Sequence, residues 1–141
     1  MKKNYKYFLS IFFCILSMES FAVNLDYFNQ GIEFYNKNDY KESKYYFEKD
    51  IVFNTKNEKS YLYLSKISAI NKDYNQQKNY LDTVLVLNPK NEEALYLKIL
   101  LNIEEGDFKK ALESNLVFSK VCKQLCSKKS DLSKMIIIDN K

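Results

Sequence analysis

An acidic residue followed by an aromatic one recurs at a fixed spacing in this 141-residue chain. The pairs are Asp39-Tyr40, Asp73-Tyr74 and Asp107-Phe108, with 34 residues from each pair to the next. A fixed period of this length constrains the fold strongly, because it is typical of solenoids and other repeat architectures. The blocks 24–57, 58–91 and 92–125 align with one another without gaps.

Each block predicts two helices, because apolar residues recur at helical spacing on both sides of a polar break. The breaks are Asn36–Asn38, Asn71-Lys72 and Glu104–Gly106, each directly before an acid–aromatic pair. Only two Gly and one Pro occur in the chain, which disfavours turn-rich β folds and Gly-rich nucleotide loops. We therefore expect six helices, near 24–37, 40–54, 58–71, 74–87, 91–105 and 108–126.

Small and aromatic residues occupy matching positions in the blocks. They are Tyr27, Gly31, Phe34, Tyr40, Ser43 and Phe47; then Tyr61, Ser65, Tyr74, Leu81, Val84 and Pro89; then Leu95, Gly106, Phe108 and Ala111. This pattern resembles the tetratricopeptide repeat, a 34-residue helix–turn–helix unit. Asp50, Gln77 and Ile99 depart from it, since smaller or more apolar residues are usual at their positions.

The resemblance implies an all-α protein, an α-solenoid of three tetratricopeptide-like repeats within residues 23–126. The helical pattern of 108–126 predicts an extended last helix, and residues 127–141 read as a polar C-terminal tail interrupted by Met135–Ile138. The repeat pattern also places Phe47 and Tyr74 between helices. Asp50 is expected to be solvated or paired with Lys49 or a neighbouring Lys, and the alternative is a buried functional carboxylate.

Proteins of this family bind peptides or helices on a concave face lined by the first helix of each repeat. The matching positions predict a groove formed by Phe28, Ile32, Tyr35, Leu62, Tyr63, Lys66, Tyr96, Leu100 and Ile103. The alternative is that some of these residues belong to the core, since an apolar stripe at helical spacing is more often core. One subfamily clamps a terminal carboxylate, but its matching positions here offer a single donor, Tyr63. Chaperone-tail binding is therefore disfavoured.

The first residues have the order of an export signal. Lys2, Lys3 and Lys6 precede the apolar stretch Tyr7–Leu16, and Ser20 and Ala22 then supply the small residues of a cleavage site. This order predicts a signal peptide over 1–22 and a mature chain that lies in the periplasm or is secreted, without stable membrane insertion. The alternative is an uncleaved anchor, although the apolar stretch is well short of the roughly 20 residues that span a bilayer.

Cys122 and Cys126 remain after removal of the signal. In an oxidising compartment such a pair is expected to form a disulfide, while reduced packing cysteines and redox or metal chemistry are the alternatives. Four residues apart in a regular helix, the two cannot be bridged without strain. A disulfide here would therefore bend or end the last helix.

The composition argues against an enzyme. The chain has no His, and all 22 of its basic residues are Lys, so imidazole bases, His metal sites and Arg phosphate forks are absent from the sequence. We expect no cofactor and no metal. The formal charge of +4 falls further when the signal is removed, so nucleic acid is not an expected partner. The favoured function is a non-catalytic adaptor that binds a protein or peptide; the alternative is a small assembly subunit of an envelope or secretion complex.

Overall fold

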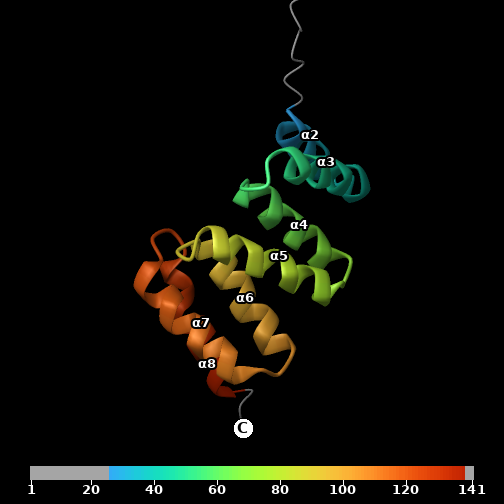
Figure 1. The fold of residues 1–141 in the computed structure, drawn as a ribbon. Coiled ribbons are helices and arrows are strands. Elements are labelled where there is room, and N and C mark those ends of the chain that lie inside the picture. The colour runs from blue at the N-terminus through green and yellow to red at the C-terminus, as the bar shows by residue number, and fades with distance from the viewer. Residues whose placement is uncertain (1–25, 139–141) are drawn as a thin grey trace, which may run out of the picture.

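The computed structural model describes residues 26–138, which form a stack of antiparallel helix pairs (Figure 1). The helices are α2 (Tyr27–Asn36), α3 (Tyr40–Phe53), α4 (Glu58–Ile70), α5 (Tyr74–Leu87), α6 (Glu92–Glu104), α7 (Phe108–Val121) and α8 (Lys129–Ile138), with a 3-10 turn at Cys126–Lys128. No strand occurs within 26–138. The all-α solenoid prediction is therefore confirmed, and the bounds of α3 to α6 lie within one residue of those expected.

The acid–aromatic pairs mark the same turn in all three repeats. The residue before each acid has a left-handed backbone, with φ of 60° at Asn38, 57° at Lys72 and 73° at Gly106. Each acid then caps the second helix of its repeat: Asp39, Asp73 and Asp107 accept from the backbone N–H of Glu42, Gln76 and Lys110 at 3.1–3.2 Å. Capping satisfies an N–H that the helix itself leaves without a partner. The 34-residue motif is thus a helix-stop and helix-start signal.

Helices α2 and α3 approach closely because Gly31 has no side chain. A Cβ atom at Gly31 would lie 2.6 Å from Cε1 of Phe47, whose side chain is fully buried. Ser43 lies in the same contact and donates its hydroxyl to the Gly31 carbonyl at 2.9 Å. These small residues let the Phe47 ring fill the space between the two helices, as the repeat pattern predicts. Tyr74, expected at an equivalent place, is instead 36% exposed, and its hydroxyl donates to Glu104.

The core runs along the stack as three successive apolar clusters. Its fully buried members include Phe47, Leu64, Ile67, Leu81, Val84, Ala94, Leu101, Ile99, Ala111 and Phe118. Each cluster is shared by neighbouring helices, as expected for a solenoid in which one helix pair cannot bury its apolar face alone.

The expected solvation of Asp50, or its pairing with Lys, is wrong. Asp50 is buried and accepts from the hydroxyl of Ser60 and from the side-chain amide of Asn57.

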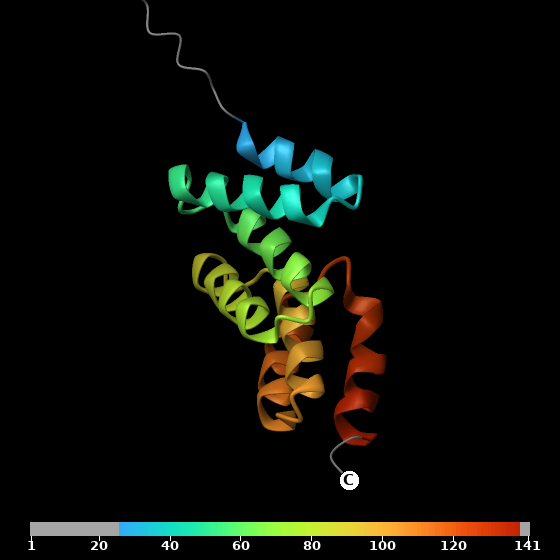
Figure 2. The same cartoon turned by 90° about the vertical axis from the view of Figure 1, so that its right-hand side faces the viewer.

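The prediction of one long last helix over 108–126 is wrong at its C-terminal end. Helix α7 ends at Val121, and Cys122 has extended backbone with ψ of 145°. The next residues form a disulfide-closed loop, the 3-10 turn and then α8, in place of most of the expected polar tail. Side chains Leu132 and Ile136 of α8 are buried in the last core cluster, so α8 caps the final repeat (Figure 2).

The 3-10 turn and α8 together keep the repeat period. They span 126–138, which is the α6 span of 92–104 moved forward by 34 residues. Helix α8 is therefore in register with the first helices of the repeats, and it packs against both α7 and α6.

The signal peptide expected over 1–22 lies outside the described residues. Within 26–138, every helix is too short or too polar to cross a membrane.

Candidate functional site

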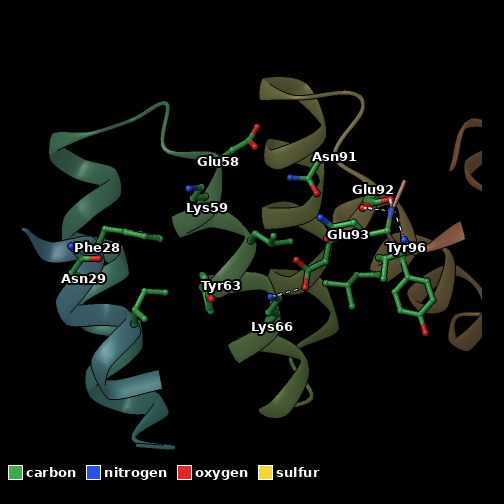
Figure 3. Close-up of a pocket in the computed structure, with 15 residues that line it drawn as sticks. Phe28, Asn29, Glu58, Lys59, Tyr63, Lys66, Asn91, Glu92, Glu93 and Tyr96 are labelled. Carbon is green, nitrogen blue, oxygen red and sulfur yellow. Dashed lines mark hydrogen bonds and ion pairs between the residues drawn. The ribbon is translucent and has the colours of Figure 1, made fainter. Parts of the chain in front are cut away.

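A groove runs across the first helices of the stack and opens to solvent. Its volume is about 1080 Å³. Helices α2, α4 and α6 supply most of the lining side chains, and the loop after α7 closes one end (Figure 3). The apolar and aromatic part of the lining consists of Phe28, Ile32, Leu62, Tyr63, Tyr96, Leu97 and Leu125.

Six of the nine residues predicted for the groove line it. They are Phe28, Ile32, Leu62, Tyr63, Lys66 and Tyr96. Several of them also contact the core, because the Tyr63 ring stacks on Phe47 with the centroids 5.0 Å apart, and Tyr96 packs near Phe118. The two interpretations of the stripe therefore both apply: one face of these rings contributes to the core and another lines the groove.

The other three predicted residues do not line the groove. Tyr35 packs edge-on against Tyr63 at 4.9 Å and against Tyr40, and its burial is the main reason why the pKa of its hydroxyl is raised. Leu100 and Ile103 pack against the core cluster that includes Leu132 and Ile136 of α8. Both residues are half-buried there, and the sequence pattern had assigned Leu132 and Ile136 to a tail.

Most charged groups of the groove lining have a partner, and two of them form an ion pair with each other. The Lys66 Nζ atom lies 2.7 Å from Oε1 of Glu93 and 4.6 Å from the centroid of the Tyr63 ring. This ion pair joins α4 to α6 across the groove floor, and its side chains retain partial exposure (Figure 3). Nearby, Glu58 accepts from the side-chain amide of Asn88 at 3.1 Å.

The carboxylate of Glu92 holds the loop that forms the end of the groove. It accepts from the backbone N–H groups of Lys123 at 2.6 Å, Gln124 at 3.1 Å and Leu125 at 3.3 Å. The hydrogen bond from Lys123, followed by those from Gln124 and Leu125, lowers the pKa of Glu92 below its ordinary value. The loop itself is closed by a disulfide between Cys122 and Cys126, with the Cα atoms 5.3 Å apart.

Nine of the fifteen lining residues lie outside the predicted set. They are Asn29, Glu58, Lys59, Asn91, Glu92, Glu93, Leu97, Gln124 and Leu125. The period carried a signal for several of them, since Glu58 and Glu92 open successive first helices 34 residues apart. Leu125 precedes Cys126 as Asn91 precedes Glu92, so continuing the period into a fourth block would have identified it.

The described residues contain no cluster of three or more His, Cys, Asp or Glu side chains suited to a metal ion. What the groove offers is an apolar and aromatic surface, a bridging ion pair and amide groups. This arrangement is suited to contact with side chains of another polypeptide.

Comparison with known proteins gives structural matches only, since no family model and no curated protein sequence matches the chain. The TPR2B domain of yeast Sti1, from its complex with pHsp70, is similar with a TM-score of 0.68 and 14% identity, covering 81% of this chain and 93% of that one. A chain of the CopN–Scc3 complex is similar with a TM-score of 0.64 and 19% identity, covering 82% of this chain and 67% of that one. At these identities the likeness concerns the fold. The described chain therefore has the fold of a tetratricopeptide-repeat solenoid.

Proposed function

We propose that this protein is a non-catalytic adaptor that binds a peptide or a helix of another protein in the groove of α2, α4 and α6. The observation that carries the proposal is the open groove itself, whose apolar and aromatic lining comes from three successive first helices. Concave surfaces of this kind are where repeat proteins bind partners. The two similar structures are both of complexes, which supports a binding role.

The lining also indicates what the occupant offers. Because Lys66 pairs with Glu93, and Glu92 is bonded to the loop, most of the groove's charged groups already have partners. An occupant therefore gains most by burying apolar side chains against the aromatic residues of the lining, Phe28, Tyr63 and Tyr96. We expect a segment with two or three exposed apolar side chains rather than a strongly charged one.

We also propose that the adaptor works outside the cytoplasm, in the periplasm or after secretion. The basic, apolar and small residues of 1–22 support export. The Cys122–Cys126 disulfide agrees with this location, because disulfides persist in oxidising compartments and are rare in the cytosol. N-terminal sequencing of the exported protein tests the proposal, with Val23 as the expected first residue. Retention of residues 1–22 would contradict it.

Site-specific photocrosslinking tests the binding role. In one variant a photoreactive phenylalanine replaces Tyr63 in the groove. In the control variant it replaces Val86, whose side chain is 80% exposed on the second helix of the same repeat. The adaptor proposal expects adducts from position 63 and few from position 86. Sequencing the adduct by mass spectrometry then defines a peptide for titration.

The titration uses Phe28→Ala as the groove variant and Phe53→Ala as the matched control. The Phe53→Ala change removes the same kind of ring, but from a side chain that is 75% exposed and lies outside the groove. If Phe28 is a hot spot, its loss weakens peptide binding at least about fivefold, or about 1 kcal/mol, while the control binds normally. Equal affinities for both variants would show that the peptide binds elsewhere.

The alternative, an assembly subunit, is favoured by apolar side chains exposed away from the groove. Val52 and Val86 occupy equivalent positions on successive second helices, and Leu116 is exposed on the third. Crosslinks from position 86 to a single defined subunit, without crosslinks from position 63, would support this alternative over the adaptor.

A further inference from the structure

The loop at the end of the groove has three backbone donors that can bond to either of two sets of acceptors. In the structure, the N–H groups of residues 123–125 donate to the single carboxylate of Glu92, from the first turn of α6. If α7 continued by one more turn, the same N–H groups would donate to the carbonyls of residues 119–121, four positions earlier in the chain. The two arrangements exclude each other.

Local sequence favours the continued helix. Residues 122–126 read Cys-Lys-Gln-Leu-Cys, with no Gly, Pro or β-branched residue, and Lys, Gln and Leu are good helix formers. The helical pattern that predicted one helix over 108–126 reflects this preference. What opposes it is the disulfide, because residues four apart on a helix have Cβ atoms about 5–6 Å apart, whereas a disulfide needs about 3.5–4.5 Å.

The loop is also part of the groove. Gln124 and Leu125 line its end, and Leu125 packs against the core cluster that contains Leu132 and Ile136 of α8. An extension of α7 through this segment would remove Lys123, Gln124 and Leu125 from Glu92. The groove would then lose its end wall, while α8 keeps its own apolar anchors in the core.

We propose that the Cys122–Cys126 disulfide is a redox latch that completes the binding groove. In the oxidised chain the loop is held on Glu92 and closes the groove; in the dithiol chain α7 extends by about one turn and the end of the groove opens. Oxidation transfers two electrons and two protons from the two thiols to a disulfide oxidant, which becomes a dithiol, and a dithiol reductant reverses the step. This inference rests on the proposed adaptor function: the groove becomes complete only where disulfides form.

Backbone NMR of the mature chain tests the rearrangement. The oxidised protein, the dithiothreitol-reduced protein and the double variant Cys122→Ser/Cys126→Ser are compared through Cα chemical shifts and amide exchange. We expect residues 122–126 to be non-helical when oxidised and helical in the other two samples, with α8 helical throughout. Dithiothreitol should leave the Ser variant unchanged, which controls for effects of the reagent. Unchanged shifts on reduction, or loss of α8, would overturn the proposal.

The Glu92→Gln variant provides a second test, because a disulfide with a purely structural role would not give the redox-dependent result expected here. In the oxidised chain the variant should speed amide exchange at Lys123, Gln124 and Leu125, because the carboxylate that accepts from them is gone. In the reduced chain it should have no effect there, since the donors have changed acceptors. The same increase in exchange in both redox states would refute the two-acceptor arrangement.

The dye bis-ANS reports on the groove without knowledge of the partner. The part of its fluorescence that Phe28→Ala removes is assigned to the groove, and we expect this part to fall on reduction of the wild type but not of the Ser double variant. A groove signal equal in both redox states would overturn the latch and leave the adaptor proposal standing. Redox-dependent shifts without any groove signal would instead count against the adaptor proposal.

Discussion

The contact between Gly31 and Phe47 gives a prediction in which two effects of known sign compete. In Gly31→Ala, the new Cβ would meet three atoms of the Phe47 ring at 2.6, 2.7 and 2.9 Å, whereas carbon atoms in contact prefer about 3.5–4.0 Å. The ring cannot move away easily. It is fully buried, stacks on Tyr63 at 5.0 Å and lies 5.8 Å from Phe28.

The expected magnitude is set by the size of this overlap. Overpacking a core costs about 1–3 kcal/mol, and a shortfall near 1 Å against a fixed ring belongs in the upper half of that range. Alanine in place of glycine stabilises a helix by about 1 kcal/mol, so it offsets only part of the cost. We therefore expect Gly31→Ala to lower the free energy of unfolding by about 1–2 kcal/mol, measured by urea denaturation followed by circular dichroism.

A double-mutant cycle separates the clash from other effects. Phe47→Leu removes two of the three ring atoms that Cβ would meet, Cε1 and Cζ, so adding Gly31→Ala in that background should be neutral or stabilising by up to about 1 kcal/mol. The reasoning is refuted if Gly31→Ala costs the same in both backgrounds, or if the single variant is as stable as the wild type.

Three further predictions concern the Glu92 carboxylate, the repeated turn and the last helix. Since the folded pKa of Glu92 is lowered, its stabilisation is present above the unfolded value of about 4.3 and is lost as pH falls through the folded value; the melting temperatures of wild type and Glu92→Gln should differ at pH 7 and converge once the pH lies below the folded pKa. Lys72→Gly should stabilise the chain by about 0.5–1 kcal/mol, because φ of 57° suits glycine, and a lower melting temperature would contradict this. Leu132→Ala should cost about 2–5 kcal/mol, whereas Ile137→Ala, 64% exposed on the same helix, should stay within about 0.5 kcal/mol; equal unfolding free energies would show that α8 is not part of the core.

The fold was predictable because its determinants are local and repeated. The pairs at Asp39, Asp73 and Asp107 combine a left-handed turn with a helix cap, and both effects act within a few residues of the chain. Any method that tracks apolar spacing and breaks finds these helices. Helix α8 was missed because its start is set by a disulfide and by the distant Glu92, while residues 122–126 alone favour helix.

Those residues of the groove that follow the 34-residue repeat could be predicted from the sequence. Phe28, Leu62 and Tyr63 come from first helices, and their positions carry over from the repeat pattern. Leu100 fits the same pattern but is half-buried against the last core cluster, to which α8 contributes Leu132 and Ile136. A periodic residue remains open only where no later helix packs over it, and a one-dimensional pattern does not contain that information.

The neighbour-to-neighbour packing of the helices has a consequence for how the chain acquires its structure. Each helix packs mainly against the next one along the sequence, and the main contact that skips a helix is the one between α6 and α8. Chains with such low contact order fold fast, because little loop entropy is lost before contacts form. Folding can begin with α2 and α3 while the remainder is still being synthesised. The end wall joins Glu92 to residues 31 to 33 positions later in the chain, so we expect it to assemble late.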